Sequence, residues 1–423
     1  MQLTSLSYQL LLVVSVAVYW ALPARLRPTL LLLTSLIFYA APYWPHALLI
    51  LGLAGLVYAV GQALLRQRRP WLLVAALGGC VAVLAYYKYA RWLLGTLADG
   101  AAVVGAAGLQ ASLAAVERRL ATDLRVPLGI SFFTFEFIHY LTDVYQGRVS
   151  AAPDTPPAAP PGSPARPLAA ARGLHRFLLF TLFFPTLLAG PIKRYQQFTA
   201  QPPSVPQRLP QEDLAAGLWR ILLGLSKKIL VADTLATVAV RLQQPDQVTP
   251  LGLWLGMYAY AGQIYADFSG YSDLAIGTAR LYGYRVPENF DWPYLATSLQ
   301  DFWRRWHISL SSWIRDYLFI PLGGSRVSSG RAAVNLLGVM ALCGLWHGAA
   351  WHFVVWGLWH GVGLGLGQLT RRVRPRPSSP GPVQRAVYTA LTFHYVCFGW
   401  VLFAAPSLRA AGVAFARMLG FAR

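Results

Sequence analysis

Histidines are the residues of this chain best placed for acid–base chemistry. His347, His352 and His360 lie in the segment from Val334 to Gln368, which contains no Asp, Glu, Lys or Arg. His307 lies upstream of this segment. An ionisable residue in so apolar a run is a candidate functional residue. Because burial without a carboxylate partner lowers the pKa of a histidine, such an imidazole is neutral and basic. It can take a proton from a hydroxyl as that hydroxyl attacks an acyl group.

Two other roles compete with base catalysis. The spacings of five and eight residues between His347, His352 and His360 scatter them around a helix, whereas a two-histidine zinc face needs a spacing of four. No Cys or carboxylate completes a ligand set nearby, so we expect no metal. A structural role, in which a buried histidine bonds to a hydroxyl or carbonyl, is our expectation for His352, His360 and His394. Base catalysis and a structural role both stay open for His307 and His347.

The segment from Asp301 to Asp316, which contains His307, has the periodicity of one amphipathic helix. One side carries apolar residues: Phe302, Trp303, Trp306, Leu310, Trp313 and Ile314. The other side carries polar residues: Asp301, Arg304, Arg305, Ser311, Ser312, Arg315 and Asp316. Its five full charges are too many for a lipid-facing span. We expect this helix to lie at an interface or to line a wet cavity inside a helix bundle.

Composition identifies the class of protein. Of 423 residues, 56% are hydrophobic and only 12% are charged, whereas soluble domains carry about 25% charged residues. The formal net charge is +20, which on its own suggests nucleic-acid binding. Most arginines, however, lie in short loops between apolar runs, as the positive-inside rule requires. We therefore exclude a nucleic-acid partner and expect a bilayer with anionic lipid.

The apolar runs predict an all-α polytopic membrane protein of about ten spans. They extend over 8–22, 29–41, 46–65, 71–94, 101–116, 126–145, 177–188, 214–240, 251–280, 334–368 and 386–404, with a turn expected at 348–350. We expect one membrane-embedded domain over residues 1–423. The Pro/Ala-rich stretch 150–173 and the basic stretch 371–383 are expected to be flexible cytoplasmic loops.

Two of these runs contain ionisable residues. Gly270 stands between Asp267 and Asp273, which predicts a local break in a helix that faces a polar interior. Glu136 and His139 lie one turn apart in the run 126–145. They either satisfy each other or contact a substrate.

Several motifs carry a family resemblance. The run 301–326 and the sequence Leu345-Trp346-His347-Gly348 resemble the membrane-bound O-acyltransferase family, in its bacterial branch of alginate O-acetylases and D-alanyl-teichoate transferases. Further similar motifs follow in the family's order: 127–135, 189–192, Lys227-Lys228 with Asp233, and 263–277.

The resemblance implies a fold in which spanning helices and re-entrant or interfacial helices surround a central tunnel. It implies an acyltransferase of the bacterial inner membrane that binds no cofactor. The donor is acetyl-CoA or another acyl thioester in the cytoplasm, and the acceptor is a hydroxyl of an exported or cell-surface glycan, such as an alginate-like polysaccharide or peptidoglycan. An extracytoplasmic acetyltransferase partner is expected. The alternatives are transfer of D-alanine from a carrier protein to a teichoic-acid-like polymer, and a transporter without chemistry.

The resemblance also assigns site residues. His347 matches the family's invariant histidine, and His307 matches its second active-site polar residue. Arg304, Arg305 and Arg315 would attract the anionic donor. A salt bridge to Asp301 is an equal alternative for the first two, whereas Arg315 has no such partner within its helix. The remaining candidates for substrate binding are Ser311, Asp267 and Asp273.

Topology is testable directly. We predict that the basic segments 66–69, 148–172 and 371–376 are cytoplasmic, because basic loops resist translocation. In a variant without the native cysteines, Arg374→Cys should not react with a membrane-impermeant thiol reagent added to intact cells. Labelling at this position would show that the protein has the opposite orientation in the membrane.

Overall fold

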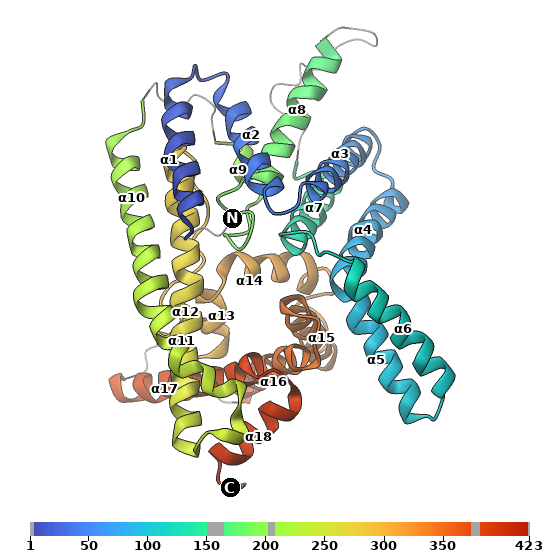
Figure 1. Ribbon diagram of the computed structural model, residues 1–423, viewed down its shortest axis with the longest axis vertical. Helices are drawn as coiled ribbons and strands as arrows, with labels where there is room; N and C mark the ends of the chain where they lie inside the picture. The colour runs from blue at the N-terminus through green and yellow to red at the C-terminus, as the bar shows by residue number, and fades with distance from the viewer. Residues whose placement is uncertain (1–3, 150–164, 202–207, 374–380, 422–423) are drawn as a thin grey trace. The chain divides into compact units, whose positions relative to one another are not determined.

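The computed structural model of the protein describes residues 4–149, 165–201, 208–373 and 381–421, which are almost entirely helical (Figure 1). Within these ranges, the one strand-like pairing is an isolated bridge between Phe290 and Trp306. The α-helices of the first half are α1 (Leu6–Ala21), α2 (Arg27–Ala40), α3 (Pro45–Arg66), α4 (Pro70–Leu84), α5 (Ala90–Val103), α6 (Ala107–Asp123), α7 (Ile130–Tyr145), α8 (Ala165–Leu182) and α9 (Tyr195–Thr199). Those of the second half are α10 (Gln211–Ser226), α11 (Asp233–Ala239), α12 (Pro250–Leu281), α13 (Leu299–Arg305), α14 (Ile308–Ile314), α15 (Ser329–His347), α16 (Trp351–Val373), α17 (Pro382–Ala404) and α18 (Leu408–Met418).

Four helical segments of the described chain are long and apolar enough to cross a membrane. They are Pro45–Arg66, Pro70–Val103, Ser329–His347 and Pro382–Ala404. The all-helical membrane class predicted from composition is therefore confirmed. The count of about ten spans and the central tunnel stay predictions.

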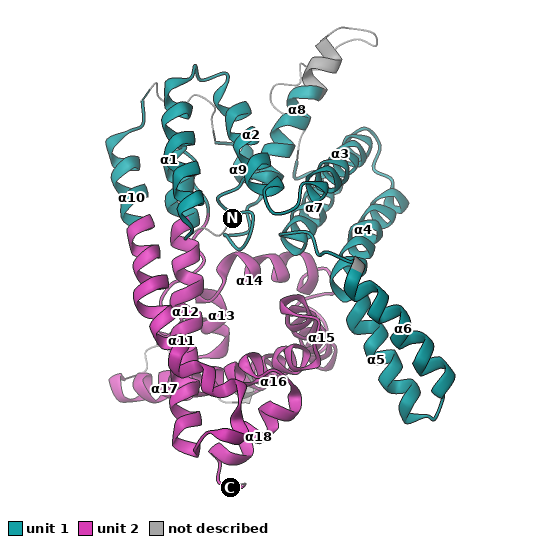
Figure 2. Cartoon of the chain, viewed as in Figure 1, with its two compact units in different colours: residues 1–220, 275–286 teal, residues 221–274, 287–423 magenta. Residues whose placement is uncertain are grey.

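The chain divides into two compact units (Figure 2). Unit 1 contains residues 1–220 and 275–286, and unit 2 contains residues 221–274 and 287–423. The expectation of one domain over 1–423 stays a prediction. The residues expected to bind substrate or do chemistry all belong to unit 2.

Helix α7 of unit 1 has a face of polar residues that contact a distant part of the chain. On its polar face, Lys193 Nζ donates to Glu136 Oε1 at 2.6 Å. His139 Nε2 accepts a hydrogen bond from the backbone N–H of Tyr195 at 3.1 Å. The expected alternative of a Glu136–His139 pair is therefore wrong. The chain around Lys193 returns to α7 and supplies closer partners than the next turn of the helix does.

Several predicted boundaries differ from the structure. Residues 165–173, expected as loop, begin α8, because Ala, Leu and Arg are strong helix formers. Residues 371–373 likewise end α16, while 150–164 and 374–380 lie outside the described residues. The run expected at 101–116 is divided between the end of α5 and most of α6, with a turn at Gly105 (φ +72°).

The break predicted at Gly270 is absent, because α12 is continuous from Pro250 to Leu281. Gly270 serves packing instead. A Cβ added to Gly270 would lie 2.8 Å from the Gly224 carbonyl oxygen, and one added to Gly224 would lie 2.6 Å from that of Gly270. Paired glycines allow helix backbones to approach closely, as is common between membrane helices.

The hairpin predicted in the histidine-bearing run is confirmed. Helix α15 ends at His347, residues 348–350 turn, and α16 begins at Trp351. The two helices pack tightly at glycines. A Cβ on Gly344 would overlap the carbonyl of Phe353, and one on Gly357 would overlap that of Met340.

The single helix predicted over 301–316 is wrong, although its apolar face is correct. The chain forms α13 and α14 with a break at Trp306 and His307 between them. Phe302, Trp306 and Trp313 are buried, as the periodicity predicted. The ring of Trp306 packs against Trp400 and Phe290, with centroids 5.0 and 5.1 Å away.

Truncation of Trp306 tests this packing. Trp306→Ala removes a large side chain that is only 3% exposed. We therefore expect the free energy of unfolding in detergent to fall by about 3–5 kcal/mol. The control is Trp219→Ala, since Trp219 is 65% exposed and its loss should change stability by about 0.5 kcal/mol or less. Equal melting of Trp306→Ala and wild type would contradict the packed face.

Candidate functional site

The backbone at His307 is held in an unusual conformation. His307 has φ 46° and ψ 54°, in the left-handed region that non-glycine residues rarely adopt. A short extended segment fixes it: Asp291 N–H donates to the Arg305 carbonyl, and Ile308 N–H donates to the Asn289 carbonyl, both at 3.0 Å. Such a strained conformation persists only where surrounding contacts hold it in place. Residues of this kind are concentrated at functional sites.

The side chain of Asn289 completes this support. Its Oδ1 accepts hydrogen bonds from Ser309 Oγ at 2.6 Å and Ser309 N–H at 3.3 Å, and its Nδ2 donates to Ser272 Oγ of α12 at 3.2 Å. Asn289 is fully buried. It therefore ties the start of α14 to α12, directly beside His307.

The imidazole of His307 lies in an aromatic pocket. Its ring centroid is 4.6 Å from that of Phe268 on α12 and 6.2 Å from that of Trp346 on α15. The side chain is 1% exposed, and Nδ1 has no hydrogen-bond partner among the described residues. Burial, and secondarily the nearby His347, hold the pKa of His307 well below its usual range. The ring is therefore neutral at physiological pH.

His347 contacts the same tryptophan. It is the last residue of α15 and is half-buried. Its ring centroid lies 4.9 Å from Trp346, 5.1 Å from Trp356 and 5.2 Å from Phe403. The fold thus brings His307 and His347, forty residues apart in sequence, into contact with the same ring, that of Trp346.

The other histidines of unit 2 divide into two kinds. His352 Nδ1 donates to the Leu402 carbonyl at 3.1 Å. His394 Nδ1 donates to the Ala390 carbonyl at 2.8 Å, and its Nε2 bonds to Tyr258 Oη at 3.0 Å. These two have the structural bonds expected. His360 does not, because neither of its nitrogens has a hydrogen-bond partner within the described part of the chain. It is fully buried between Trp303 and Trp356.

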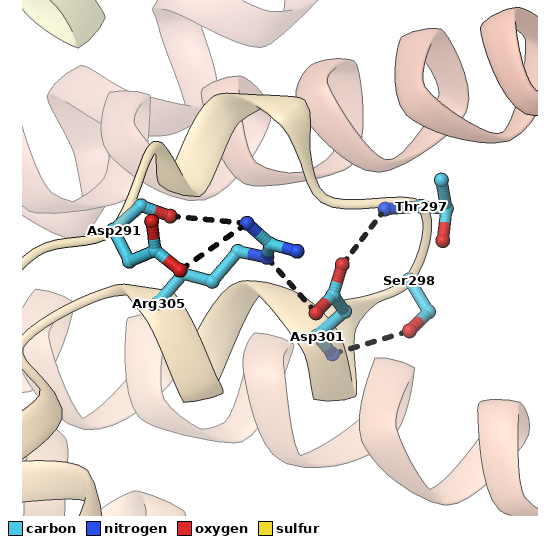
Figure 3. Close-up of polar contacts among 5 residues, drawn as sticks. All are labelled: Asp291, Thr297, Ser298, Asp301 and Arg305. Carbon is cyan, nitrogen blue, oxygen red and sulfur yellow. Dashed lines mark hydrogen bonds and ion pairs between the residues drawn. The ribbon is translucent and has the colours of Figure 1, made fainter.

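Arg305 is engaged within the protein (Figure 3). Its Nε donates to Asp301 Oδ1 at 3.0 Å, and its NH1 contacts Asp291 at both the carbonyl and the carboxylate, at 3.3 and 3.5 Å. Asp301 also accepts from Thr297 N–H at 3.4 Å, while its own N–H donates to Ser298 Oγ at 3.1 Å. The salt bridge considered from sequence is therefore present, and it anchors residues 291–298 to α13.

The other two arginines are exposed. Arg304 lies on the solvent-accessible side of α13. Arg315 pairs with Asp316, its Nε lying 2.8 Å from Oδ1, so the expectation that Arg315 has no partner within its helix is wrong. Its side chain remains 63% exposed. A role in donor attraction stays a prediction for both residues.

The remaining candidates make internal contacts. Ser311 Oγ donates to the Trp306 carbonyl at 3.0 Å, across the break at His307. Asp273 pairs with Lys227 at 2.7 Å, and Asp267 pairs with Lys228 at 2.8 Å. A π-helical turn over Lys227–Ala232 carries both lysines. These bonds give the three residues a structural role, and substrate binding by them stays a prediction.

Sequence reasoning missed the groups that position the histidines. Asn289 and Phe268 were not singled out, and Trp346 was noted only as part of a motif. A polar residue in an extended stretch gives no local sign of such a role. No group of three or more potential metal ligands occurs among the described residues.

Comparison with known proteins identifies the class. A helical membrane protein in which a buried, uncharged histidine and a second histidine contact one tryptophan is suited to acyl transfer. The model of the family described as MBOAT, membrane-bound O-acyltransferase, matches residues 167–406. The chain belongs to this family, as its motifs indicated, and is an O-acyltransferase.

Three relatives narrow the comparison. The chain is 38% identical to the probable alginate O-acetylase of Azotobacter vinelandii, over 95% of this chain and 74% of that protein. It is 33% identical to the peptidoglycan O-acetyltransferase of Helicobacter pylori, over 90% of this chain and 71% of that protein. It is 31% identical to the teichoic acid D-alanyltransferase of Bacillus subtilis, over 65% of this chain and 68% of that protein.

The left-handed backbone at residue 307 predicts a difference between two substitutions. Asn tolerates this conformation, whereas a β-branched residue is strained there. His307→Val should therefore be less stable than His307→Asn by roughly 1–2 kcal/mol, measured by thermal unfolding in detergent. Equal melting temperatures would show that the conformation at 307 is not held in the protein.

Proposed function

We propose that this protein transfers an acetyl group from a cytoplasmic thioester, acetyl-CoA in the simplest case, to hydroxyl groups of an exported or cell-surface glycan. The observation that supports this proposal is that the buried His307 and the half-buried His347 both contact the ring of Trp346. The alginate and peptidoglycan O-acetyltransferase relatives, which align over at least 90% of this chain, support acetyl as the group and a glycan as the acceptor.

His347 acts as the general base. In its neutral form, the imidazole of His347 takes the proton of the acceptor hydroxyl while the oxygen attacks the thioester carbonyl carbon. The tetrahedral intermediate collapses, the carbon–sulfur bond breaks, and the proton passes from the imidazolium to the thiolate. An ester and a free thiol are the products, and the base is regenerated. The aromatic walls formed by Trp346, Trp356 and Phe403 exclude water that would hydrolyse the thioester.

His307 orients the reacting groups. Its Nδ1 lacks a partner among the described residues, so it is available to a donor carbonyl or an acceptor hydroxyl. The strained backbone at this position supports a role beyond packing. Arg304 and Arg315, both exposed, would attract the negatively charged donor.

The setting proposed for this reaction is the inner membrane of a bacterium. About ten helices would span it around a tunnel, through which donor and acceptor approach His347 from opposite sides. An extracytoplasmic acetyltransferase would act with this protein on the acceptor glycan. No cofactor or metal is required, because the thioester itself supplies the activated acyl group.

A second candidate is the transfer of D-alanine from a carrier protein to a teichoic-acid-like polymer. The similarity to the Bacillus subtilis enzyme favours it, but that similarity covers only 65% of this chain. The same base and the same attack on a thioester would serve both reactions. Offering both labelled donors to the membranes distinguishes them.

Substitution of His347 tests the mechanism. We expect His347→Ala to lose about 10²–10⁴-fold in the rate of acyl transfer, because a positioned general base contributes this much. Its thermal unfolding should stay near that of wild type, since the ring is only half-buried. His307→Ala should be severely impaired. The assay follows labelled acyl groups from thioester to surface glycan in membranes that contain equal amounts of each variant.

The controls are other histidines of unit 2. His352→Ala and His394→Ala should keep most of the transfer activity, since both rings are engaged in bonds to backbone carbonyls. His360→Ala is a poorer control, because the loss of a fully buried ring lowers stability. Near-normal transfer by His347→Ala would refute the catalytic assignment.

A further inference from the structure

Unit 1 contains an apolar cavity of about 310 Å³ between α3, α4 and α7. Residues 50–60 of α3, 72–83 of α4 and 130–137 of α7 contribute its walls. Thr134 offers a hydroxyl, but its Oγ1 already donates to the Ile130 carbonyl at 2.8 Å. A cavity lined in this way does not hold water.

Two of the three helices that line the cavity belong to candidate membrane spans. Pro45–Arg66 and Pro70–Val103, which contribute two of its walls, are both candidate membrane spans. Helix α4 buries only Leu84 of its 15 residues, so much of its surface faces hydrocarbon or the cavity. An empty apolar cavity of this size is unfavourable. The medium around these helices is lipid acyl chain, which fits such walls without needing polar partners.

A cation stands at one end of the cavity. Lys88 lies five residues beyond Val83, the last α4 residue in the wall, so it is about 7.5 Å further along the helix axis. Its Nζ donates to Ser131 Oγ at 3.1 Å, next to Ile130 in the wall of α7. Helix α7 begins there without a side-chain cap, so its positive end adds to the attraction for an anion.

If α4 crosses the bilayer from Arg69, Lys88 lies at the level of a lipid headgroup. It lies 19 residues after Arg69, which precedes α4, and about 20 helical residues cross the hydrocarbon of a bilayer. Tyr86, Tyr87 and Tyr89 surround it in sequence, as is typical of a membrane–water interface. The ammonium group and the apolar cavity thus match the two parts of a phospholipid.

We propose that the cavity between α3, α4 and α7 binds one acyl chain of a bilayer phospholipid, whose phosphate lies against Lys88. The bound chain supports the apolar face of α7, formed by Ile130, Phe133 and Phe137. The opposite face of this helix holds Glu136 and His139 in their bonds to Lys193 and Tyr195. This proposed lipid site is independent of the acyl-transfer function proposed above.

Two adjacent glycines of α4 provide a matched test. Gly79 lines the cavity, whereas Gly78 does not, and an added Cβ meets nothing within 4 Å at either. The full chain is reconstituted in vesicles of phosphatidylethanolamine and phosphatidylglycerol with a phosphatidylglycerol that carries a diazirine on one acyl chain. Labelled residues are mapped after illumination. We expect labelling of the cavity walls in wild type and Gly78→Leu, and its loss in Gly79→Leu.

The headgroup and the specificity are tested on the same protein. A diacylglycerol with the same diazirine chain lacks the phosphate and should label the cavity walls weakly, as should phosphatidylglycerol with Lys88→Gln. Excess unlabelled phosphatidylglycerol should compete with labelling of wild type, which tests the site without any variant. Equal labelling of Gly78→Leu and Gly79→Leu, equal labelling by diacylglycerol, or labelling spread evenly over lipid-facing helices would each overturn the proposal.

Discussion

Two backbone hydrogen bonds, one on each side of the break between α13 and α14, fix the backbone of the candidate site. They join Asn289 to Ile308 and Asp291 to Arg305, and so prevent residues 299–314 from forming one continuous helix. The left-handed backbone at His307 costs about 1–2 kcal/mol. Each of these hydrogen bonds contributes about 1 kcal/mol of stability, which offsets that cost. The hydrogen bonds of Asn289 to Ser309 and Ser272 add to this balance. The direction of the His307 side chain follows from the pairing and not from helix periodicity.

Close helix packing determines where the second histidine lies. Glycines at the contact between α15 and α16 bring the two backbones together, which sets the turn at residues 348–350 and leaves His347 at the end of α15. In lipid, such contacts depend on small residues, because exclusion of water contributes little between membrane helices. The same device appears between Gly224 and Gly270. Rigid helix pairs can hold a base within the narrow limits that proton transfer requires.

Several carboxylates of unit 2 pair with nearby cations. Lys227 and Lys228 face carboxylates of α12, and Arg305 lies between Asp291 and Asp301. The rings that contact the two histidines are instead aromatic: Phe268, Trp346, Trp356 and Phe403. This separation keeps the surroundings of the imidazoles low in polarity. Electrostatic interactions with a developing charge are stronger there than in water.

The sequence by itself determined the class, most of the apolar helical segments and the identity of the candidate histidines. Long apolar runs with loop arginines permit only a helical membrane protein, and the apolar face around Trp306 followed from a period of 3.6 residues. The family motif pointed to His347 and His307 without any structure. Only the tertiary structure decided that His307 sits in a break, that Gly270 serves packing, and that Glu136 pairs with Lys193. Each of these depends on a partner distant in the chain, such as Asn289 for His307 or Gly224 for Gly270, and local periodicity contains no information about such partners.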